Sequence, residues 1–220
     1  GIALPLISFF SAVIFILTLR PIAAAMGLMD MPNPRKVHTD ATPLLGGIAI
    51  YMAILMSVVV GAFFYGIDWW LHNHYLSFFV GGAIMVMVGA LDDRRGLSTT
   101  VRLVYQAISV LIMVLGADVV LRDLGALHPG GYVVQLGVLS IPFTVLTCVG
   151  VINAINMMDG LDGLSGNLIL VSMTGFGIAN SLWGDTGHLQ LLNIVCAAVV
   201  GFLVFNQRVF WRTRASVFMG

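Results

Sequence analysis

Residues 137–163 read GVLSIPFTVLTCVGVINAINMMDGLDG, and this stretch decides the fold class of the chain. Residues 137–156 carry no charge, and about 20 mostly apolar residues are what an α-helix needs to cross the apolar core of a bilayer. Asp-Gly pairs follow at 159–160 and 162–163, and such pairs are turn signals. The stretch therefore predicts a membrane-spanning helix that ends in an acidic turn.

The composition of the whole chain agrees with a protein that lies in lipid. Of its 220 residues 59% are hydrophobic and 9% are charged, whereas soluble domains carry about 25% charged residues. Too few charges remain to cover a water-facing surface, so a soluble globular domain is excluded. The formal net charge is zero, which argues against a nucleic-acid partner.

Seven apolar stretches have about the length of a membrane span, and no linker or repeat separates them. We therefore expect an all-α, polytopic integral membrane bundle with about seven transmembrane helices, forming one domain over residues 1–220. The chain stops in mid-pattern at Gly220, so we expect a segment of a longer protein that is truncated at its C-terminus. The expected spans are 2–19, 46–66, 76–91, 103–121, 137–156, 166–183 and 189–206.

Lysine and arginine residues set the expected orientation of the bundle. Nine of the ten fall in the loops after the first, third and seventh stretches, and Arg122 is the exception. In a seven-span bundle these loops share one face, which the positive-inside rule assigns to the cytoplasm. We therefore expect Gly1 on the outer side and the acidic residues of the same loops on the cytoplasmic side.

Asp92 and Asp93 form the first acidic cluster on that side. Adjacent carboxylates repel each other unless a cation lies between them or one of them is protonated. Mg²⁺ would relieve this repulsion, since it is commonly held by one or two carboxylates together with substrate phosphates. The alternative is a hydrophilic loop in which Arg94 and Arg95 neutralise the pair.

The second cluster consists of Asn153, Asn156, Asp159 and Asp162, at the end of the quoted span. An amide at the position of Asn153 needs a hydrogen-bond partner. A straight helix of about 3.6 residues per turn cannot aim all these side chains at one point. We expect the helix to unwind into a carboxylate-lined turn, and plain turn chemistry is the alternative.

A long loop after the first span contains Asp30, Arg35, Lys36 and His38, ahead of the Gly-Gly pair at 46–47. Helix N-termini favour anions, so basic residues before a helix that begins at this pair would suit a substrate phosphate. Arg35 and Lys36 are also explained as orientation signals alone.

Together, these segments resemble the polyprenyl-phosphate N-acetylhexosamine-1-phosphate transferase family, and most closely its bacterial undecaprenyl-phosphate N-acetylglucosaminyl-1-phosphate transferases. The resemblance covers nearly the whole chain. Its most specific part is the Asn-Ala-Ile-Asn…Asp-Gly-Leu-Asp-Gly string placed after an Asp-Asp loop. The matching residues are 27–38, 43–47, 89–94, Arg102, Gln106, 153–166 and 217–220.

The resemblance implies a multi-pass enzyme of the bacterial inner membrane with ten or eleven helices and a cytoplasmic active site. Such an enzyme transfers N-acetylglucosamine 1-phosphate, or a related sugar phosphate, from a UDP-sugar to undecaprenyl phosphate and releases UMP. It uses Mg²⁺, with Mn²⁺ as a substitute. It starts the synthesis of a cell-envelope polysaccharide such as the O antigen of lipopolysaccharide. Whether the enzyme forms a homodimer is left open.

The resemblance also implies roles for single residues. It places Asp92, Asp93 and Asn156 at the metal, and Asp92, Asp93, Asp159 and Asp162 in catalysis. It assigns substrate binding to Asp30, Lys36, His38, Arg102 and Asn206. Whether the lipid phosphate attacks directly or a phospho-enzyme forms is left open.

Two departures from the family pattern matter. Some relatives carry a third aspartate at the position of Gly96. The family also places an Asp-x-Gly motif directly after Phe-Met-Gly, and a His-rich loop further on, whereas this chain ends at Gly220. We therefore expect little or no activity from residues 1–220 alone.

Two other functions compete with this one. Phospho-N-acetylmuramoyl-pentapeptide transferases share the Asp-Asp and Asn-x-x-Asn motifs, but they usually read Thr-Pro-Thr-Met-Gly-Gly where residues 42–47 read Thr-Pro-Leu-Leu-Gly-Gly. An ion-coupled transporter would also use membrane carboxylates, but near the midplane of the bilayer and not at the ends of spans.

Overall fold

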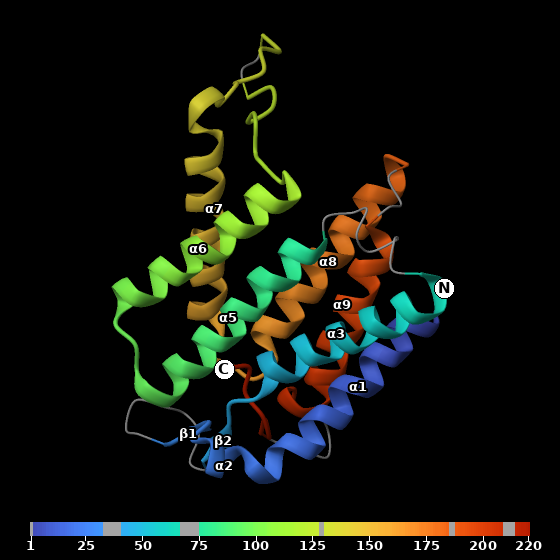
Figure 1. The fold of residues 1–220 in the computed structure, drawn as a ribbon, viewed down its shortest axis with the longest axis vertical. Coiled ribbons are helices and arrows are strands. Elements are labelled where there is room, and N and C mark those ends of the chain that lie inside the picture. The colour runs from blue at the N-terminus through green and yellow to red at the C-terminus, as the bar shows by residue number, and fades with distance from the viewer. Residues whose placement is uncertain (1, 33–40, 67–74, 128–129, 185–187, 209–213) are drawn as a thin grey trace.

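The computed structural model describes residues 2–32, 41–66, 75–127, 130–184, 188–208 and 214–220. The described chain is a bundle of long helices with very little strand, which confirms the predicted all-α class (Figure 1). The long helices are α1 (Ala3–Leu19), α3 (Gly46–Tyr65), α5 (Tyr75–Arg95), α6 (Thr99–Ala117), α7 (Ser140–Met158), α8 (Leu164–Leu182) and α9 (Leu189–Asn206). The short elements are η1 (Arg20–Ile22), α2 (Ala23–Met26), β1 (Met29–Asp30), β2 (Thr42–Pro43) and η2 (Gly137–Leu139).

Each of the seven predicted spans is helical, and six of the described segments are long and apolar enough to cross a membrane. The chain is therefore a multi-pass membrane protein. The six are Ala3–Met26, Gly46–Tyr65, Tyr75–Arg95, Thr99–Ala117, Gly137–Met158 and Leu189–Asn206. Helix α8 is helical as expected but is not among them, because it contains more polar residues, namely Ser165, Asn167, Ser172, Thr174, Asn180 and Ser181.

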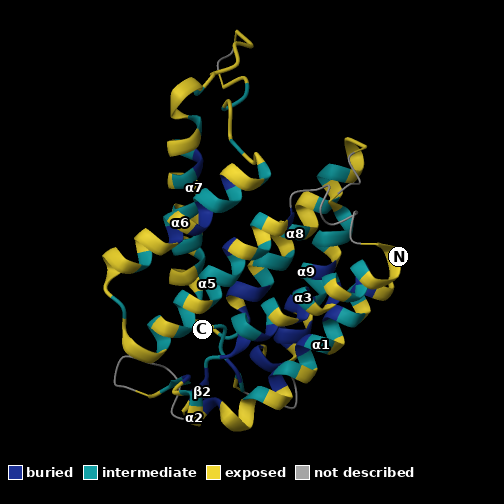
Figure 2. Ribbon diagram, in the orientation of Figure 1, coloured by how far each residue is buried: buried dark blue, intermediate teal, exposed yellow. Residues whose placement is uncertain are grey.

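Helices α1, α3 and α9 form the best-buried part of the bundle (Figure 2). Small residues let their backbones approach closely. A Cβ atom added to Gly201 in α9 would lie 2.8 Å from the carbonyl oxygen of Phe9 in α1, and Ala12 is fully buried beside it. Membrane helices associate through such packing, because lipid tails are as apolar as the side chains and provide no hydrophobic driving force.

Helices α5 and α6 form an antiparallel pair held by small residues and one buried hydrogen bond. The hydroxyl of Ser109 donates to the carbonyl oxygen of Gly81 at 2.6 Å. Closer to the start of α5 and the end of α6, a Cβ atom on Gly116 would lie 2.5 Å from the Cβ atom of Ser77. Helix α7 packs mainly against α6, and Thr144 is its only buried residue. It is therefore the most loosely held of these helices.

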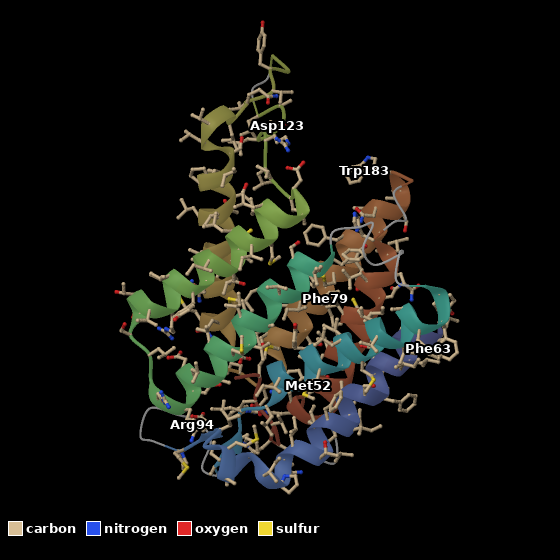
Figure 3. The ribbon with its side chains drawn as sticks, in the orientation of Figure 1. Met52, Phe63, Phe79, Arg94, Asp123 and Trp183 are labelled. Carbon is tan, nitrogen blue, oxygen red and sulfur yellow. The ribbon has the colours of Figure 1, made fainter. Side chains whose placement is uncertain are left out.

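The loop regions fall at two opposite ends of the bundle (Figure 1). One end holds β1, β2, α2 and the α5–α6 turn, and the α6–α7 connection projects at the other end. Figure 3 places Arg94 at the first end and Asp123 and Trp183 at the second. The described basic residues other than Arg122 belong to the first end, as the loop pattern predicts; they are Arg20, Arg94, Arg95, Arg102, Arg208 and Arg214.

The segment 214–220 runs across this first end and covers the beginning of α3. Phe218 donates its backbone N–H to the carbonyl oxygen of Pro43 at 2.9 Å. In return, the N–H groups of Gly46 and Gly47 donate to the carbonyl oxygens of Phe218 and Met219, at 2.9 and 2.7 Å. The first N–H groups of a helix have no acceptor inside the helix, and here the segment 214–220 provides acceptors for two of them.

Candidate active site

Asp92 holds the turn between α5 and α6. Its Oδ1 accepts the backbone N–H of Leu97 at 2.7 Å, and its Oδ2 accepts Nη1 of Arg102 at 3.0 Å. Gly96 has φ +65° and ends α5 in a left-handed conformation, which suits glycine. Helix α5 was expected to end at residue 91 but continues to Arg95, so the aspartate pair lies in its last turn and not in a loop.

The structure corrects the simplest alternative for the aspartate pair. Asp92 is neutralised by Arg102 of α6, and not by Arg94 or Arg95 as a hydrophilic loop would require. Arg102 was assigned to substrate. The contact that the structure shows for it is this ion pair, and a substrate contact stays a prediction.

Asp93 lies where several carboxylates converge. It is half-buried, and the carboxylates of Asp92, Asp30 and Asp159 are close enough to repel its charge. These groups come from α5, β1 and the α7–α8 turn. The fold therefore gathers negative charge from three distant parts of the sequence. In the described part of the chain no arginine or lysine forms an ion pair with Asp93.

Gly220 lies directly against this group. A Cβ atom on Gly220 would be 2.8 Å from Oδ2 of Asp93, and the residue has φ +80°. The segment that covers α3 therefore also touches the carboxylate cluster, which ties the cluster to the core of α1, α3 and α9.

The α7–α8 turn has the predicted form. Helix α7 ends at Met158, Asp159 follows as its C-cap, and α8 begins at Leu164 after Gly163 with φ +81°. The hydroxyl of Ser165 donates to Oδ1 of Asp159. Burial raises the pKa of Asp159, and the hydrogen bond from Ser165 partly opposes this. The Asp-Gly pairs do break the helix, which confirms the expected carboxylate-lined turn.

Asp162 and Asn206 tie this turn to the chain after α9. Oδ2 of Asp162 accepts Nε of Arg208 at 2.8 Å and the backbone N–H of Ala215 at 3.0 Å. Asn206, which is 2% exposed, accepts the N–H of Gly163 at 2.8 Å and donates to the carbonyl oxygen of Val217 at 2.9 Å. The catalytic role of Asp162 and the substrate contact of Asn206 stay predictions, because the contacts observed are within the protein.

Asn153 has the partner that its position required. Its Nδ2 donates to Oε1 of Gln106 at 2.6 Å and to the carbonyl oxygen of Val149 at 2.8 Å. Asn156 is exposed in the last turn of α7, three residues before Asp159. Its amide therefore stands free for a ligand among the described residues, since no side-chain hydrogen bond within them engages it.

Two expectations for the loop after α1 have different outcomes. Asp30 lies in β1, beside the cluster around Asp93, whereas Lys36 and His38 lie outside the described residues. The expected phosphate site at the start of α3 is not open, because Gly46 and Gly47 already donate to Phe218 and Met219. A phosphate would have to displace these two carbonyl oxygens.

The acidic cluster fits a hard divalent cation that also binds phosphate. Among the described residues no three His, Cys, Asp or Glu side chains are close enough to form a metal site by themselves. Mg²⁺ does not need such a cage, because it is usually bound by one or two carboxylates, waters and substrate phosphates. Among the described residues Asp93 and Asp159 form no ion pair, and the side-chain oxygen of Asn156, in the last turn of α7, is of a kind that such an ion accepts as a ligand.

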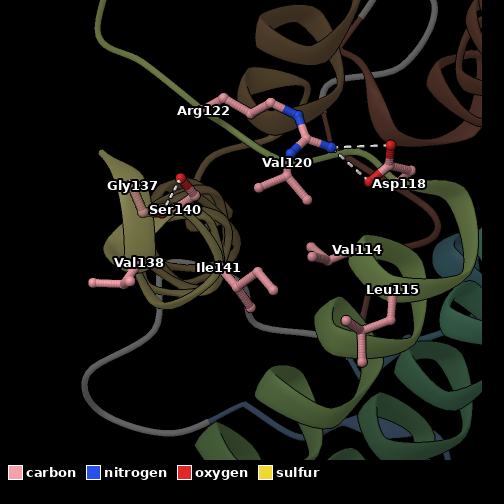
Figure 4. Close-up of a pocket in the computed structure, with 9 residues that line it drawn as sticks. All are labelled: Val114, Leu115, Asp118, Val120, Arg122, Gly137, Val138, Ser140 and Ile141. Atoms are coloured by element: carbon pink, nitrogen blue, oxygen red, sulfur yellow. Dashed lines mark hydrogen bonds and ion pairs between the residues drawn. The ribbon is translucent and has the colours of Figure 1, made fainter. Parts of the chain in front are cut away.

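A separate hollow lies between α6 and α7 at the opposite end of the bundle (Figure 4). Arg122 forms an ion pair with Asp118 at its edge, with Nη2 2.8 Å from Oδ1. Val114, Val138 and Ile141 are among the apolar residues that line it. Since α6 separates it from Arg102 and Asp92, it is not part of the acidic site.

The chain is thus a multi-pass helical membrane protein with carboxylates gathered at one end of its spans. Residues 75–220 match glycosyl transferase family 4, and the chain belongs to this family.

Relatives of known name agree with this assignment. The chain is 34% identical over 212 residues to the undecaprenyl-phosphate alpha-N-acetylglucosaminyl 1-phosphate transferase of Salmonella typhi. The matched region covers 96% of this chain and 55% of that protein. It is 32% identical over 212 residues to the protein of that name from Escherichia coli strain K12, with the same coverage. It is 29% identical over 219 residues to a probable undecaprenyl-phosphate N-acetylglucosaminyl 1-phosphate transferase of Bacillus subtilis, covering 98% of this chain and 59% of the relative. The chain thus spans about half the length of the relatives it matches.

Proposed function

We propose that this chain carries the site of a transferase that moves N-acetylglucosamine 1-phosphate from UDP-N-acetylglucosamine to undecaprenyl phosphate and releases UMP. The observation that carries the proposal is the convergence on Asp93 of carboxylates from Asp30, Asp92 and Asp159. Three segments far apart in the sequence bring these charges within electrostatic range of Asp93, at one end of the membrane spans. The names of the relatives support the transferred group, N-acetylglucosamine 1-phosphate, and the acceptor, undecaprenyl phosphate.

The charges at this site suit a reaction between two phosphates. A diphosphate and a lipid phosphate are both anions, and neither would enter a cluster of carboxylates without a cation. We infer that Asp93, Asn156 and Asp159 would hold Mg²⁺, with Asp159 in place of the expected Asp92, whose two carboxylate oxygens are engaged by Leu97 and Arg102. When bound, the ion neutralises the diphosphate oxygens and stabilises the UMP leaving group. Catalysis is then mainly positioning and neutralisation of charge.

The reaction itself exchanges one phosphorus–oxygen bond for another. An oxygen of the lipid phosphate attacks the β-phosphorus of the UDP-sugar, and the bond from this phosphorus to the bridging oxygen of UMP breaks. The lipid phosphate needs no strong base, since phosphate monoesters have a second pKa of about 6. Asp93 orients the acceptor, and Asp92 keeps the end of α5 in place through Leu97 and Arg102.

The geometry argues against a phospho-enzyme formed on Asp92, but it does not decide between the two routes for Asp93. Both oxygens of the Asp92 carboxylate are engaged, by Leu97 and Arg102, so it is a poor nucleophile. Asp93 keeps either route open. We place the site on the cytoplasmic face of a bacterial plasma membrane because the basic residues gather at the same end of the bundle.

Release of UMP by the full-length natural protein tests the proposal. The purified protein in detergent would receive undecaprenyl phosphate and Mg²⁺, and then either UDP-N-acetylglucosamine or UDP-N-acetylmuramoyl-pentapeptide. We expect release with the first donor alone and its loss on chelation. Release with the pentapeptide donor alone would move the protein to peptidoglycan synthesis. Silence with both donors from folded protein would contradict the transferase. Residues 1–220 assayed alone serve as a comparison, with little turnover expected.

A further inference from the structure

We propose that Gln106 is a positioning residue for this site. Through its hydrogen bond to Asn153 it holds the end of α7, and with it Asn156 and Asp159, against the α5–α6 turn. The assignment of a role in turnover rests on the proposed function, whereas the assignment of a role in placing the α7–α8 turn does not.

The hydrogen bond between these two amides is short and part-buried. Nδ2 of Asn153 lies 2.6 Å from Oε1 of Gln106, and Gln106 is 8% exposed although it belongs to a membrane span. A buried amide in apolar surroundings is costly unless it is hydrogen-bonded. Among the described residues this is the one side-chain hydrogen bond that joins α6 to α7.

The bond lies between the residues that each helix contributes to the site. Arg102 lies four residues before Gln106 on the same face of α6, and it donates to Asp92. Asn156 lies three residues after Asn153, in the next turn of α7. Two side-chain hydrogen bonds, Arg102 to Asp92 and Asn153 to Gln106, are therefore joined through the backbones of α6 and α7 between the aspartate pair and the turn that contains Asp159.

Helix α7 has little else to fix this end against α6. Its one buried residue, Thr144, lies near the opposite end of the helix. The turn that follows α7 is held to α8 and to the chain after α9, through Ser165 and Asn206. Without the bond from Gln106, the last turns of α7 lose their side-chain hydrogen bond to α6, and Asp159, which follows the last residue of the helix, is then positioned from the α8 side alone.

Gln106→Leu is the informative substitution. Asn153 loses one of its two hydrogen bonds and keeps the one to the carbonyl oxygen of Val149, and because its side chain is only part-buried the variant is expected to fold. The exchange Gln106→Asn with Asn153→Gln restores an amide pair of the same total length. Ser109→Ala is the matched control, since it removes a buried hydrogen bond from the same helix, but one directed to Gly81 of α5.

Two measurements on the full-length protein in detergent test the proposal. The first is hydrogen exchange of the backbone amides of residues 156–163. We expect faster exchange in Gln106→Leu, recovery in the double exchange variant, and no change in Ser109→Ala. Unchanged exchange in Gln106→Leu, or an equal increase in Ser109→Ala, would overturn the positioning role.

The second measurement is UMP release with UDP-N-acetylglucosamine at varied Mg²⁺. We expect Gln106→Leu to lower kcat about ten-fold with little change in KM, because small displacements of catalytic groups cost about this much or more. The Mg²⁺ concentration for half-maximal rate should rise, and the double exchange should restore most of the rate. Equal loss of kcat in Ser109→Ala would contradict the assignment. If the unsubstituted protein releases no UMP, the proposed function fails, and the exchange measurement still decides the position of the turn.

Discussion

Replacing Asn206 by alanine should destabilise the protein more than any other single amide substitution at this end of the bundle. Its side chain is 2% exposed and joins two backbone groups that lie far apart in the sequence, the N–H of Gly163 and the carbonyl oxygen of Val217. Alanine removes both hydrogen bonds at once. It also leaves both backbone groups buried without a partner.

The magnitude follows from these two lost bonds. A buried donor or acceptor left without its partner costs about 1–3 kcal/mol. Two such groups give a loss of about 2–4 kcal/mol if each relaxes partly toward water. For a chain of this size, 1 kcal/mol shifts the unfolding midpoint by about 2–4 °C. Asn206→Ala should therefore lower the midpoint by about 4–16 °C.

The control is Asn167→Ala. Asn167 donates to the carbonyl oxygen of Gly163 at 2.7 Å, so it contacts the same turn, but it lies on α8 and does not reach the segment 214–220. It should lower the midpoint by about a third as much, since one hydrogen bond is lost. Thermal unfolding of the full-length protein in detergent measures both. A shift for Asn206→Ala no larger than that for Asn167→Ala would refute the reasoning.

The other predictions concern the carboxylates. Asp93→Asn should lower UMP release at least a hundred-fold at unchanged protein level, and unchanged turnover would remove Asp93 from the mechanism. Arg102→Leu leaves Asp92 without its cation, so turnover and stability should both fall, measured by UMP release and thermal unfolding; an effect on stability alone would leave Arg102 a structural residue. Because burial raises the pKa of Asp159, its ionised form opposes folding, and stability is lost as pH rises through that pKa. Asp159→Asn, which still accepts from Ser165, should therefore raise the unfolding midpoint at about pH 8 relative to the parent, with the difference shrinking toward about pH 4; a difference independent of pH would exclude this explanation.

The helices were predictable from the sequence because a membrane span needs a long uncharged run, and such runs can be read directly. The end of α5 could not be read from the apolar run, although the run 76–91 was short for a span and a longer helix was expected to take residues from its loops. Hydrophobicity stops at residue 91, but the helix continues to Arg95 until Gly96 and the Asp92–Leu97 hydrogen bond end it. Charged residues at the membrane surface can stay helical, and an apolar count does not detect them.

The acidic turn was predictable for a local reason, and its attachments were not. Asp-Gly pairs break a helix wherever they occur, so the turn after α7 could be read from adjacent residues. By contrast, Asp162 pairs with Arg208, and Asn206 reaches Val217 and Gly163, through tertiary contacts that no spacing reveals. Ser165 was also missed as the partner of Asp159, although its position at the start of α8 was a usable signal.

The segment 214–220 has a consequence for the order in which the protein is made. Gly46 and Gly47 precede Phe218 and Met219 by more than 100 residues in the sequence. The carbonyl oxygens that accept their N–H groups are therefore synthesised only after the long helices of the described chain, α1 to α9. Gly220, which lies against Asp93, is likewise added after these helices. Insertion of the spans into the bilayer and assembly of the reactive end are thus separate events during biosynthesis, and a chain halted at α9 would be inserted without having that end built.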